Sequence, residues 1–188
     1  MKKMKRLVAV LLAGVMALTM LTACGGPTCE QKTGIKTGVI DYFTAGISGI
    51  SNVTFAEITD NDVITCFDEL AKKAATKIAK NPTAYSSGDA LSKEWAAFFN
   101  EQQDTLGAYY SLPLILTVSN DSQVSDEYVA DFFNKVLTDA LNNLIETLNP
   151  NNIPLDIEIH AQVYYMESSN SNHWILFTLG SATPSADT

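Results

Sequence analysis

The chain has 188 residues, and its 21 aspartates and glutamates outnumber its 12 lysines and arginines, which gives a formal net charge of −9. Arg6 is the only arginine, so the chain has little capacity for the bidentate grip that suits phosphate groups. Because nucleic-acid binding needs a positively charged surface, we expect no DNA or RNA partner.

The first 24 residues have the organisation of an export signal. Four basic residues precede an apolar run over 7–21, which is shorter than the roughly 20 residues that cross a bilayer. The tetrapeptide Leu21-Thr22-Ala23-Cys24 at its end resembles the lipobox of bacterial lipoproteins, in which an aliphatic and two small residues precede a cysteine. The resemblance implies that residues 1–23 are a cleaved signal peptide and that Cys24 becomes a lipidated N-terminus. The alternative is an ordinary secretory signal whose cysteine follows alanine by coincidence.

This resemblance also implies a location. Each acyl chain on Cys24 would contribute about 0.8 kcal/mol per buried CH₂, and two or three chains give durable attachment. We therefore expect a chain anchored to the extracytoplasmic face of the cell membrane, with the membrane as a partner through the lipid. Cleavage leaves 188 minus 23, or 165, residues, in which 8 lysines minus 21 acidic residues give a net charge of −13. This length suits one domain with a core.

Composition divides the exported chain into three parts. Residues 24–36 are predicted to form the lipidated N-terminus and a flexible tether, 37–180 a single globular domain, and 181–188 a disordered tail. Cys29 and Cys66 could form a disulfide outside the cytoplasm, which would tie the tether to the first firm helix. The alternative is that Cys66 is a small core residue and Cys29 a free thiol.

Hydrophobic periodicity predicts the elements in chain order. The segment 37–58 is ambiguous and favours a helix followed by a short strand. Apolar residues at helical spacing, with suitable caps, predict helices over 60–80, 89–103 and 126–148. The nearly continuous apolar run Leu112–Val118 between the last two is typical of a strand covered on both faces.

The C-terminal part gives the clearest hairpin pattern. Residues 155–166 alternate between apolar and polar side chains, and 173–179 return after the polar loop 167–171. Matching the apolar faces places Val163 beside Ile175. We therefore predict an α+β fold, in which three or four helices pack on a small mixed sheet that includes this antiparallel hairpin.

The polar side of the hairpin is the candidate ligand-binding face. On the predicted register it gathers Glu158, His160, Tyr164 and Trp174. The alternative is an ordinary solvent face, since successive residues on one side of a strand lie nearly 7 Å apart, too far for neighbours to share a metal ion. We predict no cofactor and no metal site, with a divalent cation kept only as part of a catalytic alternative.

Common catalytic motifs are missing from the sequence, including the G-x-S-x-G elbow, H-E-x-x-H and the P-loop. No residue is therefore assigned a catalytic role, and a binding or protein-interaction module for an unidentified protein or small molecule is the preferred hypothesis. Two alternatives stay open: a hydrolase of envelope or glycan substrates with Glu158 and His160 as acid and base, and a structural subunit of an envelope complex.

Overall fold

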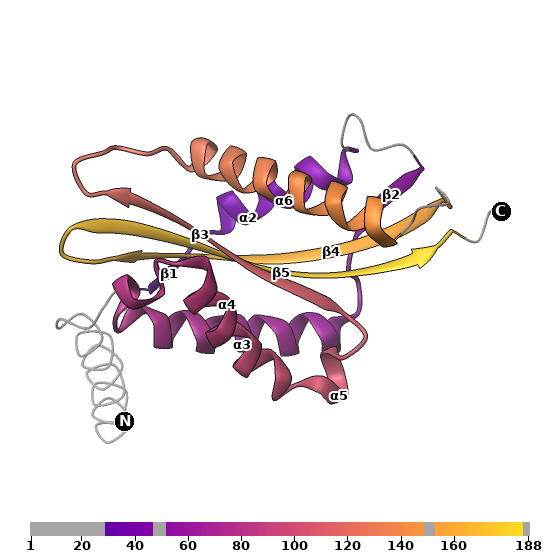
Figure 1. Ribbon diagram of the computed structural model, residues 1–188, viewed down its shortest axis with the longest axis horizontal. Helices are drawn as coiled ribbons and strands as arrows, with labels where there is room; N and C mark the ends of the chain where they lie inside the picture. Colours follow the sequence, from indigo (N-terminus) through magenta and orange to yellow (C-terminus); the bar gives the residue numbers. More distant parts are fainter. Residues whose placement is uncertain (1–28, 47–51, 149–152, 186–188) are drawn as a thin grey trace, which may run out of the picture.

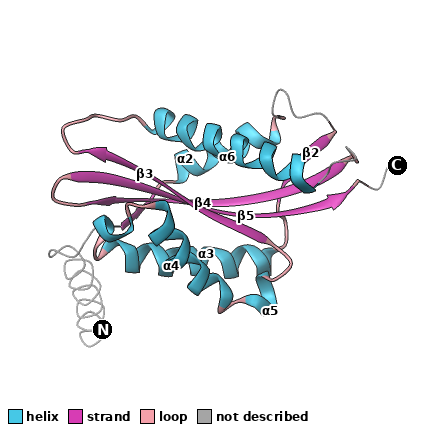
Figure 2. Ribbon diagram, in the orientation of Figure 1, coloured by secondary structure: helices cyan, strands magenta, loops and turns pink. Residues whose placement is uncertain are grey.

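A mixed β-sheet runs through the molecule between two layers of helices (Figure 1; Figure 2). The computed structural model describes residues 29–46, 52–148 and 153–185. The predicted signal peptide, the lipobox and Cys24 lie outside these residues, so their assignment stays a prediction.

The described part of the chain alternates between strands and helices. The strands are β1 (Cys29–Gln31), β2 (Val53–Glu57), β3 (Tyr110–Ser119), β4 (Leu155–Glu167) and β5 (Ser171–Pro184). The helices are α2 (Thr33–Thr44), α3 (Asn61–Ala79), α4 (Gly88–Asn100), the one-turn α5 (Gln103–Leu106) and α6 (Asp126–Leu148), with the 3₁₀ turn η1 (Pro82–Tyr85) before α4.

The long hairpin of β4 and β5 forms the centre of the sheet. β3 pairs with the free side of β5, while β1 and β2 both pair with the free side of β4. The pairing of β2 with β4 is parallel and the others are antiparallel, so the sheet is mixed, as predicted. Pro113 is tolerated within β3 because this strand lies at the edge of the sheet, where a missing backbone donor costs least.

α3 and α6 begin and end within one residue of the predicted limits, because their signals are local, whereas α4 ends at Asn100, before its predicted limit of 103. Asp60 caps α3 by accepting hydrogen bonds from the backbone N–H groups of Asp62 and Val63, at 2.9 and 3.2 Å. Ser125 accepts from the N–H of Tyr128 at 3.2 Å in the first turn of α6. η1 begins at Pro82, which cannot continue the helix before it.

The register of the hairpin differs from the prediction by one residue. Val163 pairs with Leu176, not Ile175, and Glu167 pairs with Asn172. The connecting turn therefore contains only 168–170, and the N–H of Ser168 donates to the carbonyl of Ser171 at 2.9 Å. A shift of one residue moves every side chain of one strand to the other face of the sheet.

The predicted tether and tail are both shorter than expected. The prediction of a flexible segment is wrong from Cys29 onward, because β1 pairs with β4 and α2 begins at Thr33. The prediction of a disordered tail is wrong up to Pro184, because β4 is long enough to pair with β5 to that residue. Both segments have small or polar side chains, which give no strand pattern in the sequence. The strands form there through backbone hydrogen bonds to β4.

Each face of the sheet has its own hydrophobic core. α3, α4 and α5 cover the face that carries Met166, Ile175, Phe177 and Leu179, and we call this the α3 face. α2 and α6 cover the face that carries Ala161, Val163, Trp174 and Leu176, which we call the α6 face. Figure 2 shows these two helical layers on opposite sides of the strands.

Candidate functional site

The four residues of the predicted hairpin site do not form a common surface. His160 and Tyr164 lie on the α3 face and are only 2% and 4% exposed, because α3 and α4 cover them. Trp174 pairs with Tyr165 and so lies on the α6 face. Glu158 is half-buried, and its carboxylate accepts a hydrogen bond from Ser181 at 3.4 Å. The prediction of an exposed ligand-binding face here is wrong, as is the alternative of a solvent face.

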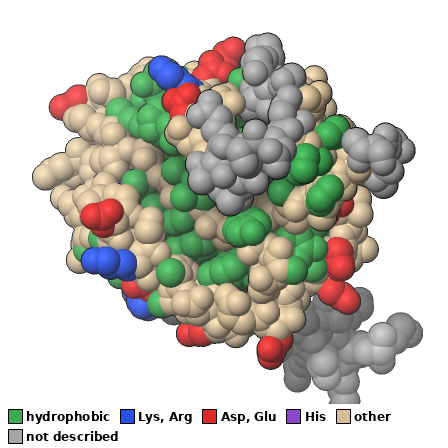
Figure 3. Space-filling view, turned by 45° about the vertical axis from the view of Figure 1, so that its right-hand side comes forward, with side chains coloured by type: hydrophobic (Ala, Val, Ile, Leu, Met, Phe, Trp, Pro, Cys, Tyr) green, Lys and Arg blue, Asp and Glu red, His purple; other side chains and the backbone are tan. Residues whose placement is uncertain are grey.

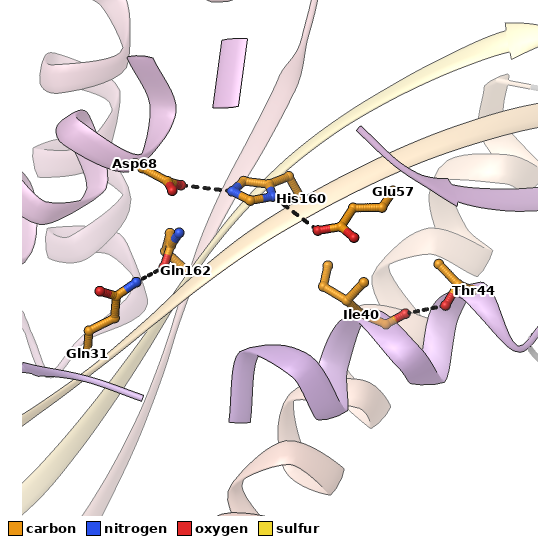
Figure 4. A network of polar contacts seen from close by, with 7 residues as sticks. All are labelled: Gln31, Ile40, Thr44, Glu57, Asp68, His160 and Gln162. Carbon is orange, nitrogen blue, oxygen red and sulfur yellow. Dashed lines mark hydrogen bonds and ion pairs between the residues drawn. The ribbon is translucent and has the colours of Figure 1, made fainter. Parts of the chain in front are cut away.

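His160 instead joins the sheet to α3 (Figure 4). Its Nε2 lies 2.8 Å from Asp68 Oδ1, and because a carboxylate only accepts, the ring N–H is the donor. Nδ1 lies 3.7 Å from Glu57 Oε1 and has no hydrogen-bond partner among the described residues. The ring also packs edge-on against Phe67, with 5.7 Å between centroids. These contacts fix His160 in the core of the α3 face.

The neighbouring polar groups extend the same buried link. Gln31 donates from its side-chain amide to that of Gln162, which is 1% exposed (Figure 4). Burial alone would raise the pKa of Asp68, but hydrogen bonds from His160 and Gln162 outweigh it and hold this pKa below its usual value. The polar side chains of His160 and Gln162 on β4 are therefore part of the core, where buried polar groups must find hydrogen-bond partners.

This arrangement does not assemble the acid and base of the hydrolase hypothesis. Glu158 and His160 leave the same side of β4 two residues apart, and the ring N–H of His160 is already bound to Asp68. Within the residues that the structure describes, no three cysteine, histidine, aspartate or glutamate side chains converge as metal ligands.

The two described cysteines, Cys29 and Cys66, are free thiols, so the disulfide that the sequence left possible is not formed. Both pack at the edge of the core on the α3 face. Burial raises the pKa of Cys29 to about 11, and it also raises the pKa of Cys66, whose Sγ lies 3.5 Å from the side-chain oxygen of Gln102. The alternative, a core residue at Cys66 and a free thiol at Cys29, fits these contacts, except that Cys29 lies in β1 and not in a flexible tether. Thiols with raised pKa values are poor nucleophiles, which argues against a reactive role for either.

The α6 face contains an apolar pocket of about 160 Å³ that the sequence analysis missed. It lies between α6 and the end of the sheet where β3 and β4 begin and β5 ends. Leu137, Ala140 and Leu141 form its helical wall. Its other lining residues are Tyr110, Ser111, Leu112, Ile157, Glu158, Ile159, Thr178, Leu179, Gly180, Ser181 and Ala182.

Small side chains in β5 create this space. Gly180 and Ala182 pair with Ile159 and Ile157, so they lie on the α6 face. Because they carry little or no side chain, they leave unfilled volume between β5 and α6. At its rim, Tyr110 is 64% exposed and belongs to the large hydrophobic side chains that face solvent. Figure 3 shows hydrophobic side chains gathered in a band on the face that brings this end of the molecule forward. An exposed apolar surface beside a pocket is typical of a binding site.

A second hollow lies at the hairpin end and is polar. Asn120, Gln123 and Asp126 line it together with Lys32, Tyr165 and Trp174. Such a mixture suits a saccharide, but the ring of Tyr165 already contacts Trp174, at 5.0 Å between centroids, and Lys32 Nζ, at 5.1 Å. Trp174 is only 6% exposed. Since a sugar ring needs an accessible aromatic face, the apolar pocket is the better candidate.

No family model, no curated protein and no solved structure matches this chain. Among the described residues, no helix combines the length and the apolar character that crossing a membrane requires. The function of the pocket must therefore be inferred from its own residues and geometry.

Proposed function

We propose that the protein is a binding module, anchored by lipid on Cys24 to the extracytoplasmic face of the membrane, whose apolar pocket holds a hydrophobic group of its ligand. The pocket between α6 and the sheet carries this proposal. The anchor is supported by the lipobox resemblance of Leu21-Thr22-Ala23-Cys24 and by the basic and apolar residues before it.

The size of the pocket limits what it holds. An engineered cavity of about 150 Å³ lined by aliphatic and aromatic side chains binds benzene. At about 160 Å³, the pocket accepts one aromatic ring or a short aliphatic chain, so the ligand inserts one group and leaves the rest outside. Burying such a group contributes roughly 25 cal/mol per Å² of apolar surface, without any directed polar contact.

A catalytic role is less well supported. The acid and base that the sequence offers are Glu158 and His160, and His160 is buried under α3 with its ring N–H on Asp68. The pocket lies on the other face of the sheet and offers no histidine, cysteine or lysine side chain among its lining residues. A pocket with such apolar walls is better suited to binding a ligand than to catalysing a reaction.

The test uses the chain from Gly25 onward, which keeps every described strand pairing and both cores. Its melting temperature is measured with indole and with hexanol, two small neutral molecules of the expected size. A ligand at 100 times its Kd adds about 2.7 kcal/mol to the free energy of unfolding. For a domain of this length, that should raise the melting temperature by roughly 5–10 °C.

Two tryptophan substitutions on α6 make the test specific. Ala140→Trp should fill the pocket from its helical wall and remove the shift. Asn142→Trp adds the same side chain at an exposed position of the same helix and should keep the shift. An equal shift in both variants, or no shift in the wild type, would exclude the pocket as the binding site.

A further inference from the structure

β3 is an edge strand with one open side. It pairs with β5 along its whole length, and no other described strand pairs with it. The N–H of Leu112 donates to the hydroxyl of Thr178 at 3.3 Å, and that hydroxyl donates to the C=O of Leu112 at 3.0 Å, so both backbone groups of Leu112 point toward β5. Because this direction alternates along a strand, the backbone groups of the intervening residues point away from the sheet. These residues include Ser111, Pro113, Ile115 and Thr117.

The outward backbone groups of these four residues have no hydrogen-bond partner among the described residues. Pro113 occupies one of the outward positions, where its missing N–H breaks no bond within the sheet. The other three residues present N–H donors, and all four present C=O acceptors. The outer side of β3 is therefore a row of unpaired donors and acceptors.

The opposite edge of the sheet is better protected. There β4 is covered by β1, with three residues, and β2, with five, and each of these short strands carries a glutamate. Short strands and charged side chains are devices that prevent a sheet edge from pairing with another chain. β3 has ten residues, and none of them is charged. Apart from Pro113, it lacks these devices, so its edge is suited to strand addition.

The apolar pocket lies beside this open edge. Tyr110 and Leu112 pair with Gly180 and Thr178, and their side chains lie on the α6 face. Of the large side chains that line the pocket, only Tyr110 and Leu112 are exposed, which places an opening of the pocket at β3. A strand added to β3 would lie about 4.8 Å farther out. Every second side chain of that strand would lie on the α6 face, next to this opening.

From the unpaired backbone groups and the adjoining pocket we infer that the ligand is an extended segment of a partner polypeptide. The segment pairs with β3 as an additional strand and inserts one apolar side chain into the pocket. The inference rests on the proposed function, since it uses the same pocket. In this mode of recognition the backbone hydrogen bonds supply affinity, and the pocket selects the side chain.

A second copy of this chain is a less suitable partner. Two antiparallel β3 strands related by a twofold axis would place their hairpin turns at opposite ends of a joint sheet. Cys29 pairs with Met166 near that turn, and the proposed anchor Cys24 lies only five residues before Cys29 (29 minus 24). The two lipids would therefore leave from opposite ends, which disfavours such a pair on one membrane. A partner segment imposes no such condition.

Labelled nonapeptides test the inference by fluorescence polarisation with the chain from Gly25 onward. The reference peptide is Ser-Thr-Val-Thr-Phe-Thr-Val-Thr-Ser, whose valines and phenylalanine share one face when it is extended. Replacing its phenylalanine by serine should weaken binding at least about tenfold, because no apolar side chain then fills the pocket. Ala140→Trp should weaken binding of the reference peptide by a similar factor, and Asn142→Trp should not.

Backbone methylation tests the strand pairing. One modified peptide carries N-methyl groups at its threonines, and the other at its valines and phenylalanine. The N–H groups of these two sets point to opposite edges of an extended peptide. One modified peptide should therefore bind within about threefold of the reference, and the other at least about tenfold more weakly. Equal affinities of the two modified peptides would contradict pairing with β3.

Matched substitutions locate the pairing on the protein. Ile115→Pro removes an outward N–H and should weaken binding of the reference peptide by at least about threefold, whereas Ile115→Val keeps this N–H and should weaken it by less than about twofold. If Ile115→Pro does not fold, hydrogen exchange of the unsubstituted chain replaces it. The N–H groups of Ser111, Ile115 and Thr117 should exchange at least about tenfold more slowly with the peptide bound, and unchanged exchange would overturn the inference.

The remaining outcomes are also decisive. Equal binding of the phenylalanine and serine peptides would show that the pocket takes no part, which overturns the inference. A dimer in sedimentation velocity that Ile115→Pro abolishes would assign the edge to a second copy instead. If no peptide binds while indole and hexanol raise the melting temperature, the inference fails and the proposed function stands. If neither the peptides nor the small molecules bind, both fail.

Discussion

The helices pack differently on the two faces of the sheet. On the α3 face, large aromatic side chains fill the space under the helices: Phe67 packs against Trp95 with 5.8 Å between ring centroids, and Trp95 against Phe177 with 4.5 Å. On the α6 face, Gly180 and Ala182 lie opposite α6 and leave a pocket. The dense packing on the α3 face indicates that this face holds the fold together, and the space on the α6 face supports the proposal that the ligand binds there.

The largest loss of stability should come from a substitution on the α3 face. Phe67 is fully buried between Trp95 and His160, so Phe67→Ala should lower the free energy of unfolding by about 3–5 kcal/mol. Leu141→Ala, at the wall of the pocket, should cost about 1–2 kcal/mol, because Leu141 already borders empty space. Urea unfolding of both variants measures the difference, and equal losses would contradict this comparison of the two faces.

Loss of the hydrogen bond between His160 and Asp68 should give the next largest loss of stability. Asp68→Ala removes the acceptor of the His160 ring N–H and leaves a buried polar group unpaired, which should cost about 1–3 kcal/mol. Asp62→Ala, at an exposed position of the same helix, should cost a few tenths of a kcal/mol, because it loses only a favourable charge in the first turn. Thermal unfolding of the two variants side by side checks this ranking.

As the pH falls from neutral, His173 should affect the stability of the fold first, and Asp68 should affect it only at lower pH. Burial lowers the pKa of His173 below its ordinary 6.5, and its ring nitrogens lie 3.0 Å from the hydroxyls of Thr117 and Ser171. As the pH falls below about 6.5, the unfolded chain takes up a proton that the folded chain resists, so stability should decrease.

Asp68 acts in a lower range. Its pKa is held below the ordinary 3.8, so its contribution is complete above that pH and is lost as the pH falls further. Urea unfolding at pH 7.5, 6.0, 5.0 and 3.5 follows both steps. In His173→Gln the decrease between pH 7.5 and 5.0 should become smaller, and an unchanged profile would show that His173 is not its cause.

The smallest change in stability should accompany the largest change in binding. A Cβ atom at Gly180 would lie 3.4 Å from the carbonyl oxygen of Glu158, an ordinary though close contact. Gly180→Val should therefore alter the free energy of unfolding by less than about 1 kcal/mol while it reduces the volume of the pocket. Loss of the indole-dependent shift in melting temperature, with the midpoint in urea nearly unchanged, is the expected result.

The helices were predictable because their signals are local. α3 and α6 lie within one residue of their predicted limits, and their caps, Asp60 and Ser125, make the expected hydrogen bonds. The sheet was harder, because the register of a hairpin depends on its turn. The serines of 168–171 made the turn look longer than it is, and the resulting shift placed Trp174 on the wrong face.

The site could not be predicted because it depends on what lies across the fold. His160 and Gln162 look like solvent-facing residues until α3 is placed over them. The pocket arises from Gly180, Ala182 and Ala140, small residues from distant segments that meet only in the tertiary structure. Gly180 in an apolar strand was the one local signal, since a glycine inside a strand often marks close approach or missing side-chain volume.

The most direct test of the proposed function is an NMR titration of the methyl groups with indole. The side chains of Leu137, Leu141, Ile157 and Ile159 line the pocket, so their methyl signals should shift when indole binds. Those of Ile175 and Leu179, whose side chains pack in the core of the α3 face, should stay in place, with Leu179 sensitive only through its backbone beside the pocket. Shifts confined to the α3 face, or no shifts at saturating ligand, would contradict the assignment of binding to the α6 face.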